Sequence, residues 1–64
     1  MKIGQVVKFR KEILDIAKPN TPIKEVVDLF KNEKMIVTDM DEFDFVKINN
    51  KNEFINSIWL EEIQ

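Results

Sequence analysis

Residues 43–63 (FDFVKINNKNEFINSIWLEEI) constrain the fold more than any other stretch of the chain. Alternating apolar residues lead into an asparagine-rich turn at residues 49–52, which predicts a strand followed by a chain reversal. A short strand at residues 53–55, a corner at Asn56-Ser57 and a closing strand that begins with Trp59 follow. We therefore expect the apolar side chains of both chain ends to meet in one interior, wrapped by a curled antiparallel sheet.

The chain has 64 residues, of which 44% are hydrophobic, and it contains neither cysteine nor histidine. This length predicts one domain over residues 1–64, which buries only about 60% of the surface that its unfolded chain exposes. The missing residue types exclude disulfides, thiolate nucleophiles and the commonest metal ligand. We therefore expect no enzymatic activity, no bound metal and no cofactor.

Charge is distributed unevenly along the chain. Residues 1–34 hold eight Lys and Arg against five Asp and Glu, whereas residues 35–64 hold two against seven. No apolar run approaches the roughly 20 residues that span a bilayer. The first residues match a signal peptide poorly, because Lys8 and Arg10 follow a short apolar run. We expect a cytoplasmic protein without a membrane partner.

The first half of the chain predicts one strand and one helix. Residues 2–9 alternate as a strand, in which Gly4 marks a bulge or a close backbone approach. We interpret residues 10–18 as a loop with one helical turn, because a residue before proline disfavours helix. Thr21 then caps a helix that has Pro22 at its first position. The apolar stripe of this helix has i, i+3, i+4, i+7 spacing and comprises Ile23, Val26, Val27 and Phe30.

The second half predicts strands. Residues 35–40 (MIVTDM) alternate with period two, Asp41-Glu42 form a turn, and residues 43–49 form the return strand. The asparagines of the next turn tolerate the left-handed backbone conformation that such turns need.

The return strand contains a conflict of parity. Phe43 and Phe45 share a parity opposite to that of Val46 and Ile48, so one register cannot bury all four on a single face. Either a bulge near Asp44 re-phases the strand, or one phenylalanine is exposed. We prefer a bulge, or a second face covered by the helix.

Three segments together resemble the small SH3-like proteins of phages and prophages of Gram-positive bacteria: KIGQVVKF (2–9), MIVTDMDEFDFVKIN (35–49) and FINSIWLEEI (54–63). The last is similar to the ending of such modules, a strand plus a turn of 3₁₀ helix. The resemblance implies a mainly β chain with one helix (α+β). It would be a small SH3-like barrel of about five antiparallel strands, with an amphipathic helix inserted between strands 1 and 2. The resemblance implies a fold rather than an activity.

Four carboxylates and two phenylalanines gather around the expected hairpin: Asp39, Asp41, Glu42, Phe43, Asp44 and Phe45. Their spacing does not match a calcium-binding loop, which needs a glycine and a distal glutamate. A solvated polar turn is the plain interpretation. Exposed phenylalanines beside carboxylates would instead form a protein-binding patch. Our leading hypothesis is a non-catalytic interaction module that binds an unidentified protein partner through this hairpin.

The alternative hypothesis is a nucleic-acid-binding module that uses the basic segment Lys8, Arg10, Lys11 and Lys18. Small barrels of this kind sometimes bind RNA or DNA through basic loops, with aromatic side chains that stack on bases. The net charge of −2 argues against it, because a nucleic-acid binder is expected to have a clearly basic face. Lysines beside a strand also protect an exposed sheet edge, and we favour this interpretation.

Trp59 has two interpretations. It could grip a ligand, as aromatic side chains do in SH3-type peptide grooves. It could also close one end of the barrel against Phe9 or Phe30. We favour the second, because a tryptophan that buries about 150–250 Å² contributes most inside so small a core.

Overall fold

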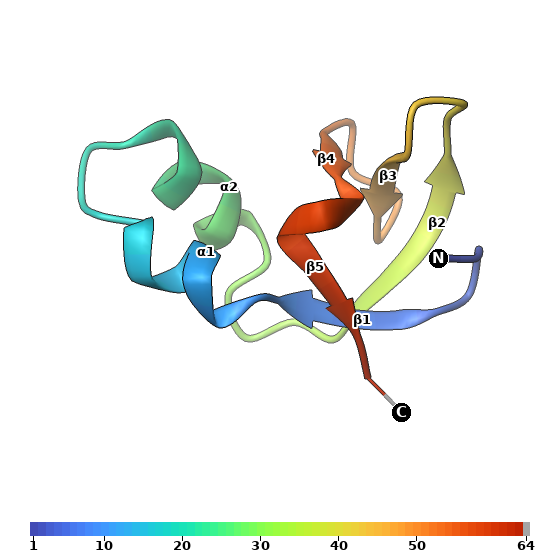
Figure 1. Cartoon of the computed structure of the whole chain (residues 1–64), viewed down its shortest axis with the longest axis horizontal. Helices are drawn as coiled ribbons and strands as arrows, with labels where there is room; N and C mark the ends of the chain where they lie inside the picture. The colour runs from blue at the N-terminus through green and yellow to red at the C-terminus, as the bar shows by residue number, and fades with distance from the viewer. Residues whose placement is uncertain (64) are drawn as a thin grey trace.

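The computed structural model describes residues 1–63, which form one open antiparallel sheet of five strands and two α-helices (Figure 1). The elements in chain order are β1 (Val6–Phe9), α1 (Lys11–Ile16), α2 (Pro22–Leu29), β2 (Met35–Met40), β3 (Phe45–Ile48), β4 (Phe54–Asn56), the 3₁₀ helix η1 (Ser57–Trp59) and β5 (Leu60–Glu62). The strand order is β4-β3-β2-β1-β5, so the first and last strands pair. A mainly β chain of the α+β type is confirmed.

The core lies on the inner face of this sheet. Pairs such as Phe9↔Leu60 between β1 and β5 bring residues from both chain ends into it. Phe30, directly after α2, is the core residue from the helical segment. The buried side chains are Val7, Phe9, Phe30, Met35, Val37, Val46, Ile48, Ile55 and Leu60. The expected single interior, to which both chain ends and the helical region contribute side chains, is therefore present.

Two predicted elements are confirmed at their predicted starting residues. Strand β2 covers residues 35–40, where the apolar alternation places it. Helix α2 begins at Pro22, and the Oγ1 of Thr21 accepts a hydrogen bond from the backbone N–H of Lys24 at 3.2 Å. The hydroxyl satisfies one of the N–H groups that a helix start leaves without a partner.

Residues 10–18 contain more helix than the sequence predicts. Helix α1 has six residues, whereas we expected one turn within a loop, so two helices rather than one separate β1 from β2. Ile13 of α1 packs against the core, which supplies the tertiary contact that a short helix needs. Figure 1 shows α1 and α2 together, to one side of the sheet.

The first strand is shorter than predicted. It begins at Val6, because residues 3 and 4 form a turn in which Gly4 has a φ of 92°. The backbone N–H of Gly4 donates to the carbonyl of Val37 at 2.8 Å. Apart from Gly4 and its two chain neighbours, no residue has an atom within 4 Å of the place where a Cβ of Gly4 would stand, so a close approach is not the reason for glycine here. The positive φ is the reason.

Neither α-helix of residues 1–63 has the length and apolar character needed to cross a membrane.

Candidate functional site

One carboxylate holds the loop between β2 and β3. The Oδ1 of Asp41 accepts hydrogen bonds from the backbone N–H groups of Phe43 at 2.8 Å and of Phe45 at 3.0 Å. The backbone N–H of Asp41 donates to the carbonyl of Phe45 at 2.9 Å. Asp44 has a φ of 64°, a conformation that aspartate adopts more readily than most residues. Together these contacts order the backbone from residue 41 to residue 45.

This loop resolves the conflict of parity. Strand β3 begins at Phe45 and not at residue 43, so Phe43 lies in the loop, where 70% of its surface is exposed. Val46 and Ile48 face the core with 0% exposure, and Phe45 faces outward. The register shift that we expected near Asp44 lies in β2, between residues 37 and 39. The bulge near Asp44 that we preferred is therefore not needed, and both phenylalanines are exposed, Phe43 in the loop and Phe45 on the outward side of β3.

The four predicted carboxylates fall into two pairs. The Oδ1 of Asp39 accepts from the backbone N–H of Met40 at 2.9 Å, so Asp39 and Asp41 both bind backbone. Among residues 1–63, the side chains of Glu42 and Asp44 make no hydrogen bond and no ion pair. The same part of the chain contains no group of three or more acidic side chains placed to hold a metal ion. All four residues are exposed, but only Glu42 and Asp44 have carboxylates without a bonded group among residues 1–63.

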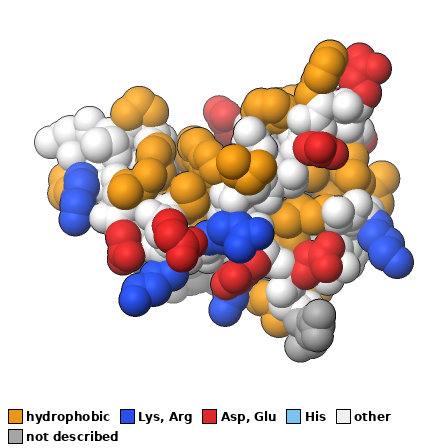
Figure 2. All heavy atoms as spheres, in the orientation of Figure 1, with side chains coloured by type: hydrophobic (Ala, Val, Ile, Leu, Met, Phe, Trp, Pro, Cys, Tyr) orange, Lys and Arg blue, Asp and Glu red, His pale blue; other side chains and the backbone are white. Residues whose placement is uncertain are grey.

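The outer face of β3 and β4 continues this aromatic surface. Phe45 is 36% exposed and Phe54 is 44% exposed. Lys47 pairs with Phe54 across the two strands, and its Nζ lies 5.0 Å from the centre of the Phe54 ring. At the upper right of Figure 2, where Figure 1 places the β2–β3 connection, a hydrophobic side chain stands beside acidic ones. We name Glu42, Phe43, Asp44, Phe45 and Phe54 the hairpin surface.

The basic segment is not assembled into one site. The Nζ of Lys8 lies 3.4 Å from a carboxylate oxygen of Glu61, and the Nη1 of Arg10 lies 3.9 Å from the other. The Nε of Arg10 also donates to the carbonyl of Ile58 at 2.9 Å, which joins the end of β1 to η1. Lys11 is the first residue of α1, and Lys18 follows the other end of that helix. One carboxylate thus partly neutralises two of the four cations.

Trp59 lies at the end of η1 and is half-buried against the core. The backbone N–H of Arg10 donates to the carbonyl of Trp59 at 2.9 Å. Phe9 and Phe30, the two residues against which we expected Trp59 to pack, belong to the core and contact each other, with ring centroids 6.2 Å apart. Trp59 packs against this core but is not one of its buried residues.

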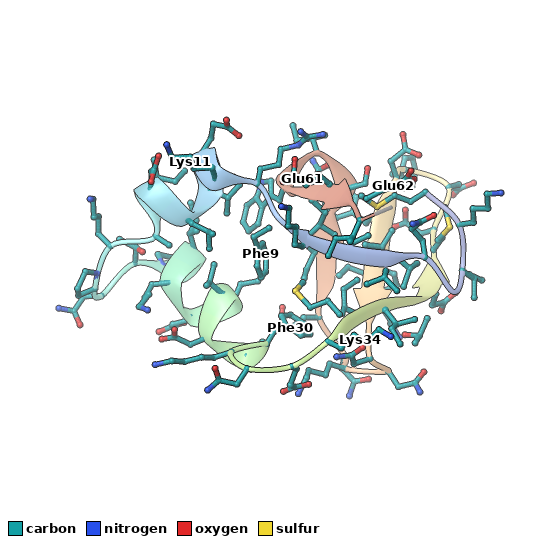
Figure 3. The ribbon with its side chains drawn as sticks, turned by 90° about the horizontal axis from the view of Figure 1, so that it is seen from below. Phe9, Lys11, Phe30, Lys34, Glu61 and Glu62 are labelled. Atoms are coloured by element: carbon teal, nitrogen blue, oxygen red, sulfur yellow. The ribbon has the colours of Figure 1, made fainter. Side chains whose placement is uncertain are left out.

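Sequence reasoning missed a groove between β1 and the two helices. Its volume is about 370 Å³, and its apolar residues are Phe9, Leu14, Val27, Phe30 and Met35. Figure 3 shows Phe9 and Phe30 side by side between the helices and the sheet. The available signal for this groove was Leu14, an apolar residue directly after Ile13. Because we expected a loop at residues 10–18, the sequence did not indicate which way the side chain of Leu14 points.

Charged side chains surround this apolar floor. They are Lys8, Lys24, Asp28 and Lys31, three cations against one carboxylate. The Nζ of Lys24 lies 2.8 Å from the Oδ1 of Asp28. Among the described residues, Lys31 takes part in no ion pair. We name the whole feature, floor and rim, the lysine-rimmed groove.

No family model, no curated protein and no solved structure matches this chain.

Proposed function

We propose that this chain is a small non-catalytic interaction module that binds another protein through the hairpin surface. The observation that carries this proposal is Phe43, a large aromatic side chain with 70% of its surface exposed on an ordered loop. Aromatic side chains that enter a partner's pocket supply much of the binding energy of protein interfaces. A loop that is already ordered loses little conformational entropy on binding.

The surroundings of Phe43 indicate what kind of partner fits. Glu42 and Asp44 flank it with carboxylates that bind no other described group. Opposite charges around an apolar contact raise the association rate and disfavour wrong partners. The complementary surface would therefore have an apolar pocket with a basic rim.

As part of this proposal, we assign the chain to the SH3-like barrels, related to the small SH3-like proteins of Gram-positive phages and prophages, with a cytoplasmic location. The strand order β4-β3-β2-β1-β5 supports the fold assignment, because it pairs the first strand with the last. The 3₁₀ helix η1 directly before β5 also supports it, since the resemblance implies such a turn at the end of the chain.

A photo-crosslinking phenylalanine analogue at position 43, introduced in cells of the native host, tests the proposed function. We expect one defined protein to be captured, and to be captured far less from position 3, since Ile3 is similarly exposed (64%) but lies outside the hairpin surface. The purified partner should bind Phe43→Ala at least about tenfold more weakly than wild type, whereas Ile3→Ala should bind normally. Equal affinity for wild type and Phe43→Ala would show that another surface mediates binding.

Nucleic-acid binding through Lys8, Arg10, Lys11 and Lys18 is the alternative proposal, and it has weaker support because Glu61 pairs with two of these cations. It requires binding to bulk DNA or RNA that falls steeply with salt concentration and is lost on Lys11→Glu.

A further inference from the structure

We infer that the partner of the hairpin surface is the lysine-rimmed groove of a second copy of this chain. The inference rests on the proposed function, because the loop that carries Phe43 forms one half of the interface. The groove forms the other half. Both halves are present on the same molecule, and each has the chemistry that the other lacks.

The groove has room for an aromatic side chain. Its volume of about 370 Å³ lies within the range of sites that hold small ligands, which begins near 300 Å³. The Phe9 and Phe30 rings form part of its floor, and aromatic rings favour tilted contacts with further aromatic rings. Leu14 lines the groove with half of its surface exposed, so an incoming phenylalanine would cover it.

The charges of the two surfaces are complementary. The groove carries Lys8, Lys24 and Lys31, of which Lys8 pairs with Glu61 and Lys24 with Asp28, whereas the loop carries Glu42 and Asp44 on either side of Phe43. Lys31 makes no ion pair among the described residues, nor do the two loop carboxylates. A seated Phe43 would therefore place opposite charges around an apolar contact that excludes water, where they attract more strongly than in bulk solvent.

The positions of the two surfaces determine the form of the assembly. In Figure 1 the helices that flank the groove and the β2–β3 connection lie at opposite sides of the molecule, whose longest extent is 30 Å. A molecule therefore cannot fill its own groove with its own loop. The contact joins two different surfaces, and such head-to-tail contacts produce open chains or closed rings. We expect weak association, because a single loop in a groove buries little area.

Sedimentation velocity of the purified full chain over a concentration series provides the first test. For wild type, we expect the weight-average mass to rise with concentration. Phe43→Ser should abolish this rise in mass because it removes the aromatic side chain of the loop. Leu14→Glu should abolish it because it places a charge in the apolar groove. Ile3→Ser removes a comparably exposed apolar side chain outside both surfaces, so it should behave as wild type. Circular dichroism checks that each variant is folded.

Mixing the two defective variants provides the decisive test. Phe43→Ser keeps an intact groove and Leu14→Glu keeps an intact loop, so an equimolar mixture can form one contact and no more. We expect dimers that do not grow further with concentration. A mixture that stays monomeric while wild type associates would overturn the inference, and so would association that survives in Phe43→Ser.

The outcomes separate this inference from the proposed function. If wild type stays monomeric at every concentration, the second copy is not the partner. Capture of a different protein by a crosslinker at position 43 would then still support the hairpin surface as a binding site. If crosslinking at position 43 captures nothing and wild type stays monomeric, both the inference and the proposed function are wrong.

Discussion

The side chain of Asn49 connects the turn after β3 to residues 33–36, where β2 begins. Its Oδ1 accepts from the backbone N–H of Ile36 at 2.9 Å, and its Nδ2 donates to the carbonyl of Lys34 at 2.9 Å and to Glu33 at 3.2 Å. Its φ of 54° lies in the left-handed region, as the sequence predicts for an asparagine turn. The turn is thus predictable from local chemistry, whereas the contacts to residues 33–36 depend on how β2 meets β3.

We predict that Asn49→Gly lowers the free energy of unfolding by about 1–3 kcal/mol, because it removes three hydrogen bonds and leaves the N–H of Ile36 without its acceptor. Asn50→Gly is the matched control, since Asn50 also has a positive φ (60°) but its side chain makes no hydrogen bond among residues 1–63. Its effect should stay within about 0.5 kcal/mol. Urea unfolding of both variants measures the difference, and equal effects would show that backbone conformation alone matters here.

At the scale of elements, Thr21 joins the two helices. Its Oγ1 donates to the carbonyl of Lys18 at 2.6 Å and accepts from the N–H of Lys24 at 3.2 Å, so one hydroxyl binds the exit of α1 and the start of α2. We predict that Thr21→Ala lowers the free energy of unfolding by about 1 kcal/mol, whereas Thr21→Ser keeps most of the stability that the threonine hydroxyl provides. Thermal and urea unfolding measure both values. A Thr21→Ser variant as unstable as Thr21→Ala would indicate that the methyl group, and not the hydroxyl, is responsible.

Elements with strong local signals were predictable, and elements defined by tertiary contacts were not. Strand β2 has a clear alternation, and α2 has a capping threonine followed by proline, so both start where expected. Helix α1 has no side-chain cap and gains its support from Ile13 against the core, which the sequence does not reveal. The lysine-rimmed groove was missed for the same reason, because it forms only where α1, α2 and β1 meet.

At the scale of the whole molecule, the exposed Phe43 was one of two alternatives that the sequence left open. The parity of residues 43–48 requires a departure from a regular strand, but it does not show whether the strand contains a bulge or begins later and leaves Phe43 in an exposed loop. The Asp41 carboxylate decides this by ordering the loop through residue 45, which leaves Val46 and Ile48 facing inward. The exposed position of Phe43 and the inward direction of Val46 and Ile48 therefore both depend on this one loop.

The stability of so small a domain depends on a few core side chains. Ile48 is fully buried in β3 (0% exposed), and a core of this size rarely supplies more than about 3–5 kcal/mol. We predict a loss of about 0.5–1.5 kcal/mol for Ile48→Val and about 2–5 kcal/mol for Ile48→Ala, so that much of the alanine variant is unfolded at room temperature. Far-UV circular dichroism during urea unfolding measures these losses. Ile3→Ala, at a residue that is 64% exposed, should change the free energy of unfolding by no more than about 0.5 kcal/mol. If Ile48→Ala unfolded at the same urea concentration as Ile3→Ala, the side chain of Ile48 would not be buried in the core. The inward direction of Val46 and Ile48, with which the exposed position of Phe43 is linked, would then be wrong.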